Sequence, residues 1–328
     1  MRHGIAVVAF TPRGAELGRL LAEELGASLA CSGQEGFSLT DWTAEQFPKR
    51  EALVFVGAAG IAVRAIAPHI RHKAEDPAVL CVDELGAYVI PLLSGHLGGA
   101  NALARELAAL TGGEAVITTA TDLNALFAVD LWAKKQGMAV LQTERIKNVS
   151  AKLLRGESVR IDCPWPVSGE RPRLVELGAP EDVCVSCRRE SGDALQLVPR
   201  IVTLGIGCRR GTTLAQLETV FSRFCDERGL LPQAVAAAAS IALKADEEGL
   251  LTFCAAHGWS LHFYSAEELK ALPGSFSASP FVEQTTGVDN VCERAAVCAG
   301  GRLMEAKYAA EGVTFAAAEG PFAPDWSW

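Results

Sequence analysis

Short runs of apolar residues alternate with amphipathic segments over the first 120 residues, and this alternation restricts the fold more than any other sequence feature. Buried strands are predicted at 4–10, 52–56, 78–82, 87–92 and 115–118. Helices are predicted at 14–25, at 98–110 and in the segment that ends at Pro68. Strands that alternate with helices indicate βαβ units, so we expect an N-terminal α/β domain with a mainly parallel sheet over 1–130.

The alternation weakens after residue 130 and returns at residue 199. A helix at 144–155 and a strand at 158–162 are predicted to belong to a small middle module over 131–198, which continues as a linker rich in proline, glycine and charge from 163. A strand at 200–206 and helices at 212–224, 235–246 and 288–299 predict a C-terminal α/β domain over 199–328. The tail after Gly320 is predicted to be a loop.

Composition excludes several classes of protein. The chain of 328 residues is 49% hydrophobic, which excludes a disordered protein, and its net charge of -9 argues against nucleic-acid binding and against a polybasic membrane anchor. The first apolar run is too short for a signal peptide. The longest stretch without a charged residue, 85–104, is interrupted by Pro91 and glycines and is not a membrane span.

Most of the ten cysteines lie singly in apolar runs, as is typical of a reduced cytoplasmic protein. We therefore expect a cytoplasmic location. Cys184 and Cys187 form one C-x-x-C pair without a second pair or paired histidines, so burial is favoured over a redox or zinc role, which stays open.

Three glycine-rich segments follow predicted strands and precede predicted helices, where open parallel sheets bind their ligands. Glycines allow a ligand to approach the backbone, and free N–H groups at a helix start attract anions. The alternative for each segment is a tight helix–sheet turn. The candidate binding residues are Gly57, Gly60, Arg64, Ser94, Gly95, Gly98, Gly99, Asn101, Gly205, Gly207, Cys208, Arg209, Arg210, Gly211 and Thr212.

His96 is the sharpest catalytic candidate, because it follows a strand and imidazole exchanges protons near neutral pH. Asp83 and Glu84 end the preceding strand and are expected to orient His96 or to replace it; a solvated turn is the alternative. The strand predicted at 115–118 is followed by a polar run that contains Thr118, Thr119 and Asp122. The hydroxyl groups of this run are candidates for binding ligand carboxylates. The alternative for Asp122 is that it only caps the next helix.

The glycine segment at 205–211 fails the dinucleotide-binding fingerprint. It has one residue too many before its third glycine, and the acidic residues that follow end a helix rather than a second strand. A phosphate-binding P-loop is also absent from the sequence.

The sequence at these loops resembles the CbiG family of cobalamin-biosynthesis proteins, cobalt-precorrin 5A hydrolases. The resemblance lies in the runs 54–68, 90–101, 117–122 and 204–212, with further likeness at 287–296. It covers most of 1–160 and 199–316 and is weak across 163–198.

This resemblance implies that the chain opens the δ-lactone of a cobalt tetrapyrrole with water and releases acetaldehyde. It also implies that the cobalt arrives with the substrate, so no protein-bound metal or cofactor is expected, and that neighbouring enzymes of the pathway are candidate partners. From the residues themselves we expect His96 to act as the base and amides of 95–100 to stabilise the oxyanion. We expect Arg64, Arg209 and Arg210 to bind substrate carboxylates.

Two alternatives differ in class. One is a non-catalytic tetrapyrrole carrier, because the C-terminal part also resembles the stand-alone protein CobE. The other is a nucleotide-dependent oxidoreductase on a Rossmann-like sheet, against which the glycine spacing counts. The sequence makes no prediction of oligomeric state.

Overall fold

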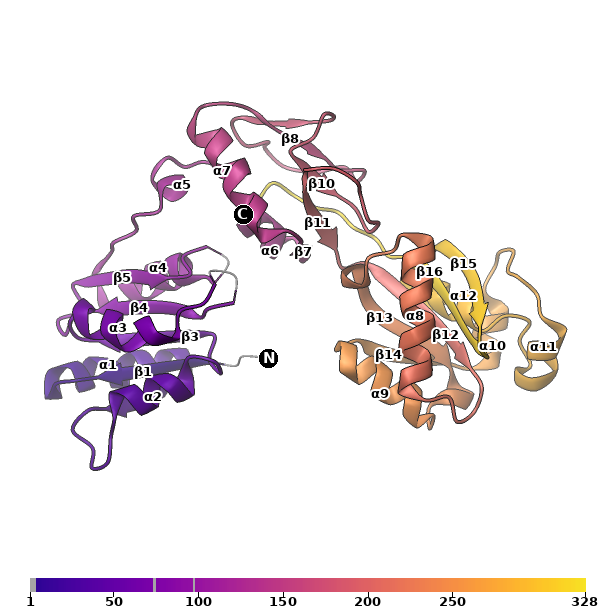
Figure 1. Cartoon of the computed structure of the whole chain (residues 1–328), viewed down its shortest axis with the longest axis horizontal. Coiled ribbons are helices and arrows are strands. Elements are labelled where there is room, and N and C mark those ends of the chain that lie inside the picture. Colours follow the sequence, from indigo (N-terminus) through magenta and orange to yellow (C-terminus); the bar gives the residue numbers. More distant parts are fainter. Residues whose placement is uncertain (1–3, 73–74, 97) are drawn as a thin grey trace. The chain divides into compact units, whose positions relative to one another are not determined.

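The computed structural model describes residues 4–72, 75–96 and 98–328, and it divides the chain into two compact units, Met1–Leu131 and Trp132–Trp328. Within these described ranges, strands and helices occur together in both units and the strands form three sheets (Figure 1). The predicted α/β fold class is confirmed. The finer division into 1–130, 131–198 and 199–328 stays a prediction.

The sheet of the first unit has the strand order β2-β1-β3-β4-β5-β6. Strands β1 to β4 are mutually parallel, whereas β5 is antiparallel to β4 and parallel to β6. The direction reverses because the connection 83–87 is too short for the crossover helix that parallel neighbours need. The strands are β1 (Ile5–Ala9), β2 (Ser28–Cys31), β3 (Ala52–Val56), β4 (Ala78–Val82), β5 (Tyr88–Leu93) and β6 (Glu114–Ala115).

Helices cover both faces of this sheet. Leu21 and Leu107 pack with Val54 in one buried cluster, and Phe47 and Phe55 belong to a second. Neighbouring residues of β3 thus point into different clusters, which explains why the strand is apolar throughout. The helices are α1 (Pro12–Leu25), α2 (Leu39–Gln46), α3 (Ala59–Ile66), α4 (Ala100–Thr111) and α5 (Ala120–Leu123).

The segment 163–199, predicted to be a linker, instead contributes strands to a five-stranded middle sheet of order β7-β11-β10-β8-β9. These strands are only three to five residues long, too short to show a periodic apolar pattern. The elements of this region are α6 (Val129–Lys135), β7 (Met138–Val140), α7 (Ile146–Leu154), β8 (Val159–Asp162), β9 (Val175–Leu177), β10 (Val183–Val185) and β11 (Leu195–Pro199).

The tail after residue 320 returns to α6. Trp326 stacks on Trp132 with ring centroids 5.4 Å apart, and the indole Nε1 of Trp132 donates a hydrogen bond to the carbonyl of Asp325 at 2.6 Å. The Gln136 amide also donates to the Asp325 carboxylate at 3.1 Å. The tail lacks helices, as expected for a loop, but buried aromatic packing fixes it in place.

The C-terminal sheet has the order β14-β13-β12-β16-β15, in which β12, β13 and β14 are parallel and the β15–β16 hairpin is antiparallel. Its strands are β12 (Val202–Cys208), β13 (Val235–Ile241), β14 (Ser260–Tyr264), β15 (Arg302–Ala310) and β16 (Val313–Glu319). Its helices are α8 (Leu214–Arg228), the 3₁₀ turn η4 (Ala242–Lys244), α9 (Glu248–His257), α10 (Ala266–Ala271), α11 (Pro280–Thr286) and α12 (Cys292–Gly300).

The helix predicted at 235–246 is wrong, because its first seven residues form the strand β13. Four consecutive alanines at 236–239 favour a helix by intrinsic propensity. In the fold, β13 lies between β12 and β14, with helices on both sides of the sheet, and small side chains suit that position. The helix predicted at 288–299 is found, but it begins later, at Cys292.

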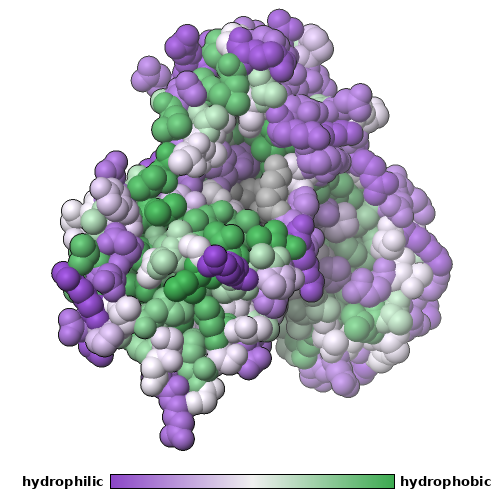
Figure 2. Space-filling view, turned by 60° about the vertical axis from the view of Figure 1, so that its left-hand side comes forward, coloured by the Kyte–Doolittle hydropathy of each residue, from purple (hydrophilic) through white to green (hydrophobic). Residues whose placement is uncertain are grey.

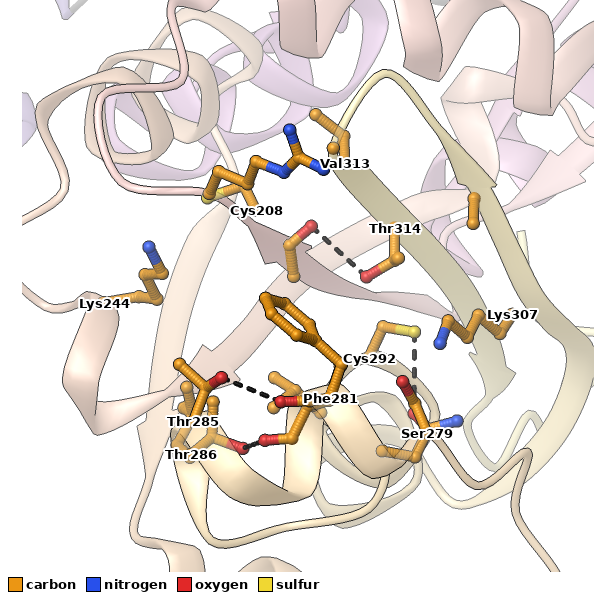
Figure 3. A pocket seen from close by; sticks show the side chains of 18 of the residues that line it. Cys208, Lys244, Ser279, Phe281, Thr285, Thr286, Cys292, Lys307, Val313 and Thr314 are labelled. Carbon is orange, nitrogen blue, oxygen red and sulfur yellow. Dashed lines mark hydrogen bonds between the residues drawn. The ribbon is translucent and has the colours of Figure 1, made fainter.

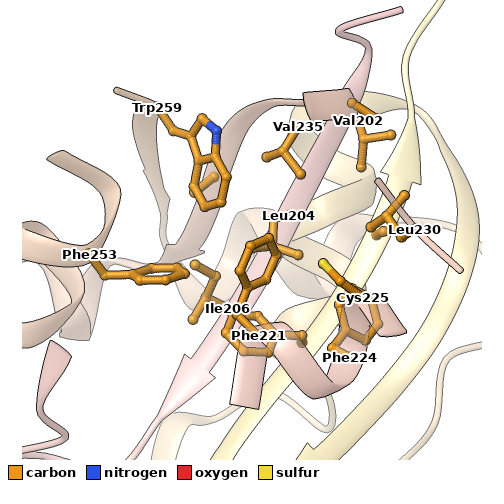
Figure 4. Packing of buried hydrophobic residues seen from close by; sticks show 14 of the residues in the cluster. Val202, Leu204, Ile206, Phe221, Phe224, Cys225, Leu230, Val235, Phe253 and Trp259 are labelled. Carbon is orange, nitrogen blue, oxygen red and sulfur yellow. The ribbon is translucent and has the colours of Figure 1, made fainter. Parts of the chain in front are cut away.

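The largest buried cluster of the second unit lies between the C-terminal sheet and α8 and α9 (Figure 4). Phe221 makes edge-to-face contacts with Phe253 and Trp259 over Leu204 and Ile206. On the opposite face, α12 lies so close to β12 that a Cβ atom at Gly205 would stand 1.8 Å from the carbonyl oxygen of Cys292.

Hydrophobic side chains gather on the forward face of the first unit in Figure 2. Exposed large apolar residues of this unit include Leu20, Leu85, Tyr88 and Leu110. None of the helices among the described residues has both the length and the apolar character that crossing a membrane requires.

We expect Gly205→Ala to lower the free energy of unfolding by about 3 kcal/mol, because the added methyl group would force α12 away from the sheet. Urea denaturation followed by circular dichroism measures this. Gly33→Ala is the matched control, because a Cβ there meets nothing within 4 Å. Equal stability of the two variants would contradict the close packing of α12.

Candidate functional site

The reversal at β5 separates two of the three glycine segments. The segment 57–64 follows β3, whereas 94–101 follows β5, which runs in the opposite direction in the same sheet. The two segments therefore lie at opposite ends of the sheet. The structure therefore does not bring Gly57, Gly60 and Arg64 together with the His96 segment.

At the first of these ends, the side chains serve the local structure. A Cβ at Gly57 would lie 2.7 Å from the ring of Phe10, and Arg64 donates to the carbonyl of Gly60 at 3.3 Å. The Asp83 carboxylate accepts hydrogen bonds from the amides of Leu85 and Tyr88 inside the β4–β5 turn.

Asp83 and Glu84 do not approach His96. Glu84 accepts a hydrogen bond from the Thr11 hydroxyl at 2.7 Å, at the start of α1. Strand β5 lies between the turn and His96, so the structure contradicts the expectation that these carboxylates orient His96. The alternative weighed from the sequence, a polar turn, describes both residues.

At the other end of the sheet, His96 lies between two carboxylates. Its Nε2 is 2.8 Å from Oδ2 of Asp122, and its Nδ1 is 3.5 Å from Oδ2 of Asp130. The Thr121 hydroxyl is 3.2 Å from the same Nε2 atom. The side chains of His96, Asp122 and Asp130 are 16%, 13% and 7% exposed, so water reaches the imidazole while most of the cluster is buried.

Helix α4 holds Asp122 in this position. Asn101 donates to Asp122 at 3.0 Å and to the Thr119 hydroxyl at 2.7 Å, and Arg105, one turn further on, donates to Asp122 at 2.6 Å. Asp122 therefore does not cap α5, which is the alternative raised by its sequence position. Thr118 lies in the extended segment just before Thr119.

The described residues of the loop 94–99 are folded tightly, and this uses amides that were expected to be free. The amides of Gly99, Ala100 and Asn101 donate to the carbonyls of His96, Ser94 and Gly95 respectively. These amides are therefore not available for an oxyanion, contrary to expectation for Gly99 and Ala100.

Ser94 has an unusual backbone conformation, and two glycines of this loop are closely packed. Ser94 has a φ of 58°, a conformation that non-glycine residues rarely adopt. A Cβ at Gly98 would lie 2.3 Å from Cβ of Ser94, and one at Gly95 would lie 2.8 Å from the Asn101 amide oxygen.

The two carboxylates change the acidity of the imidazole. The hydrogen bond to Asp130 raises the pKa of His96, partial burial opposes it, and Asp122 raises it further. Burial alone would raise the pKa of Asp122, but the hydrogen bonds from Arg105 and His96 outweigh burial and lower it. Protonated His96 therefore contributes to the stability of the fold. This contribution is fully present at pH values below 6.5, the ordinary pKa of histidine, and is lost as the pH rises through the raised pKa of His96 in the folded protein.

The third glycine segment, 205–212, lies at the end of β12. Gly207 approaches Thr314, whose hydroxyl donates to the Gly207 carbonyl at 3.2 Å. The Thr212 hydroxyl donates to the Arg209 carbonyl at 2.7 Å. Gly211 has a φ of 78°, and its amide donates to the buried Glu247 at 2.6 Å, so the amide is not free for an anion.

This loop borders a cavity of about 720 Å³ in the second unit (Figure 3). The end of β13, the turn η4, helix α11, the N-terminal end of α12 and the β15–β16 hairpin form its other walls. The lining includes four of the predicted binding residues, Gly207, Cys208, Arg209 and Arg210. A cavity of this size is in the range of small-molecule sites.

The two arginines of the loop differ in availability. Arg210 forms a two-pronged ion pair with Asp246 at 3.0 and 3.2 Å. Arg209 lies along Gly312, and its guanidinium forms no ion pair with any residue of the described ranges. Arg209 is thus the better placed of the two for an incoming carboxylate.

Several residues of these sites were missed from the sequence. Asp130 lies 34 positions after His96, in a segment predicted without a motif, whereas Arg105 lies nine positions after His96, in the helix predicted at 98–110. Lys307 and Phe281, which line the cavity, lie in β15 and α11, elements that the sequence pattern did not predict. The available signal for Arg105 was its position one helical turn after Asn101, which places both side chains on the same face of the predicted helix.

The C-x-x-C pair is buried and consists of free thiols. Cys184 belongs to β10, and Cys187 belongs to the main cluster of the second unit. Burial raises the pKa of each thiol to about 12, so both stay neutral.

Comparison with known proteins places the chain in a family. Residues 41–122 match the family described as "Cobalamin synthesis G N-terminal", 127–216 match "Cobalamin biosynthesis central region", and 202–318 match "Cobalamin synthesis G C-terminus". The chain belongs to the CbiG family. The matched regions of this family include the His96 cluster and the loop 205–212.

Relatives in this family are similar over most of their length. Cobalt-precorrin-5A hydrolase of Salmonella typhimurium is 37% identical over 95% of this chain and 96% of its own. Cobalt-precorrin-5A hydrolase of Priestia megaterium is 32% identical over 76% of this chain and 73% of its own. A solved structure of CobE, a protein from the cobalamin biosynthetic pathway, is 31% identical over 37% of this chain and 91% of its own, with a TM-score of 0.34.

We expect Asp130→Asn to lower the pKa of His96, because the substitution removes the largest influence that raises it. A pH titration of the His96 ring protons by nuclear magnetic resonance, assigned with His96→Gln, measures the change. Asp83→Asn is the matched control and leaves the pKa of His96 unchanged. The same decrease in both variants would contradict the geometry of the cluster.

Proposed function

We propose that this CbiG protein is a cobalt-precorrin-5A hydrolase. The observation that carries this proposal is the 37% identity to the Salmonella hydrolase across nearly the whole of both chains. The His96 cluster supports it independently, because it offers proton transfer at an accessible site. The cobalt of this reaction belongs to the substrate.

We assign His96 to proton transfer, beginning in its protonated form. An imidazole between two carboxylates keeps its proton to a higher pH than a free one, which does not fit the expected role of an initial base. Water adds to the lactone carbonyl carbon, the acyl carbon–oxygen bond breaks, and the departing oxygen takes the proton of His96. The proton released by the added water passes to solvent, so His96 is left neutral.

The same residue serves the second step. Neutral His96 takes the proton of the new hydroxyl group, the adjacent carbon–carbon bond breaks, and its electron pair passes into the macrocycle as acetaldehyde leaves. A ring carbon then accepts a proton, which balances the reaction. The protein thus supplies position and proton transfer, and the macrocycle supplies the electron sink.

Cationic side chains are the candidates for binding the carboxylates of the substrate. Arg105 uses one N–H group on Asp122 and is 55% exposed, so its other donors are available to a substrate carboxylate beside His96. In the second unit, Arg209 is the candidate for binding a carboxylate at the cavity of that unit. Contacts with neighbouring enzymes of the pathway stay a prediction.

The two alternative functions are not favoured. A pure carrier would not require a solvent-accessible imidazole between carboxylates, and the matched relatives that span the chain are named hydrolases. A nucleotide-dependent oxidoreductase would require the glycine fingerprint that the segment 205–211 lacks.

We expect His96→Ala to reduce acetaldehyde release at least a hundredfold while tetrapyrrole binding persists, because proton transfer is lost and the cationic contacts remain. Coupled enzymatic detection of acetaldehyde measures the rate, and the absorption spectrum of the bound substrate measures binding. His262→Ala, at an exposed histidine of β14, is the matched control. Turnover by His96→Ala at the wild-type rate would remove His96 from the mechanism.

We expect Arg209→Ala to weaken substrate binding about tenfold and to slow the chemical step less, because a charge-assisted contact is lost away from the reacting bonds. Arg210→Ala has a smaller effect, since Arg210 is already paired with Asp246. Apparent affinity and single-turnover rate distinguish binding from chemistry. An unchanged affinity in Arg209→Ala would show that this loop does not bind a carboxylate.

A further inference from the structure

Phe281 has the largest exposed fraction, 73%, among the large hydrophobic residues of the described ranges, and it lines the cavity of the second unit. Figure 3 shows its ring directed into the cavity from α11. No other aromatic ring of the described residues contacts it. The ring therefore presents an unoccupied flat surface within a concave site.

The cavity is cationic although the whole chain carries a net charge of -9. Its lining contains four cationic residues and a single acidic one, Glu311, which is already paired with Arg223 at 2.7 Å. The two cysteines of the lining, Cys208 and Cys292, add no charge, because burial raises the pKa of both thiols. The cavity thus attracts anions.

The four cations are not equivalent. Lys244 pairs with Glu247 at 3.1 Å and Arg210 pairs with Asp246, whereas the ammonium of Lys307 and the guanidinium of Arg209 have no ion-pair partner among the described residues. Lys307 projects from β15 (Figure 3), and Arg209 directly follows the last residue of β12. Two unpaired charges on separate walls suit a ligand with several carboxylates.

We propose that this cavity is a binding site for a flat, conjugated polycarboxylate, in which Phe281 stacks on the ring face and Lys307 binds a rim carboxylate apart from the one at Arg209. An aromatic platform with surrounding cations matches a ligand that combines a π-system with peripheral acid groups. The identity of the natural ligand rests on the proposed function, because cobalt-precorrin-5A is such a molecule. The positioning roles of Phe281 and Lys307 are the new assignment.

The test uses the full chain and uroporphyrin III, a metal-free planar octacarboxylate that has no lactone to hydrolyse. Titration followed by the shift of the porphyrin absorption band gives its Kd. We expect Phe281→Leu to raise the Kd about fivefold and Phe281→Tyr to restore it, since tyrosine keeps the aromatic face. We expect Lys307→Met to raise the Kd about tenfold and Lys307→Arg to restore most of the affinity.

Lys270→Met, at an exposed lysine of α10 outside the cavity, is the matched charge control and leaves the Kd unchanged. Unfolding midpoints equal to the wild type show that the variants fold. Wild-type affinity in both Phe281→Leu and Lys307→Met, or no binding of uroporphyrin III by the wild type, would overturn the proposal.

Turnover distinguishes this proposal from the proposed function. With cobalt-precorrin-5A, we expect Phe281→Leu to raise KM more than it lowers kcat. Acetaldehyde release by the wild type with unchanged KM in both variants would overturn the site and leave the hydrolase function standing. Binding of uroporphyrin III that weakens in both variants, without acetaldehyde release by the wild type, would overturn the function and leave the site standing.

Discussion

The antiparallel pairing of β5 with β4 determines which polar side chains of the N-terminal unit meet. The connection 83–87 is too short for a helix, so the chain turns back, and the Asp83 carboxylate holds this turn through two amides. The reversal carries Ser94 and His96 to the end of the sheet where Asp76 begins the return of the chain into β4. Strand β6 follows β5 in the same direction and brings Asp122 to the same end.

The carboxylates around His96 give the site its chemical character. One carboxylate beside an imidazole leaves the second nitrogen free to accept a proton, as in a catalytic triad. Here the second nitrogen also faces a carboxylate, so the imidazole keeps its proton to a higher pH and is better suited to give a proton first. Arg105 and Asn101 donate hydrogen bonds to Asp122, and these reduce the repulsion between the carboxylates of Asp122 and Asp130.

The sequence predicts those elements whose pattern arises locally. Strands β3 and β4 were predicted because both faces are covered, which leaves five apolar residues in succession. The direction of β5 in the sheet was not predicted, because an apolar run has the same pattern in a parallel and in an antiparallel strand. The residues of β13 are small enough for a helix, and only burial between two neighbouring strands decides the outcome.

The residues of the candidate sites also divide into those that a local sequence pattern indicates and those that it does not. Gly98 and Gly207 stand out in the sequence because backbone or side chains pass too close for a Cβ atom. Asp130 and Lys307 do not, because each lies beside the other residues of its site only in the folded chain. A resemblance to a family supplies the reaction but not these contacts, which depend on the three-dimensional arrangement of otherwise ordinary charged residues.

The stacking of Trp132 on Trp326 has a consequence for how the chain is made. The two rings are separated by nearly two hundred positions, and every strand of the middle and C-terminal sheets lies between them. While the ribosome is still synthesising those strands, Trp326 is not yet present to cover the indole of Trp132. The exposed indole is then a target for chaperones that bind exposed aromatic side chains. We therefore expect the packing around α6 to be completed only after translation has passed residue 326.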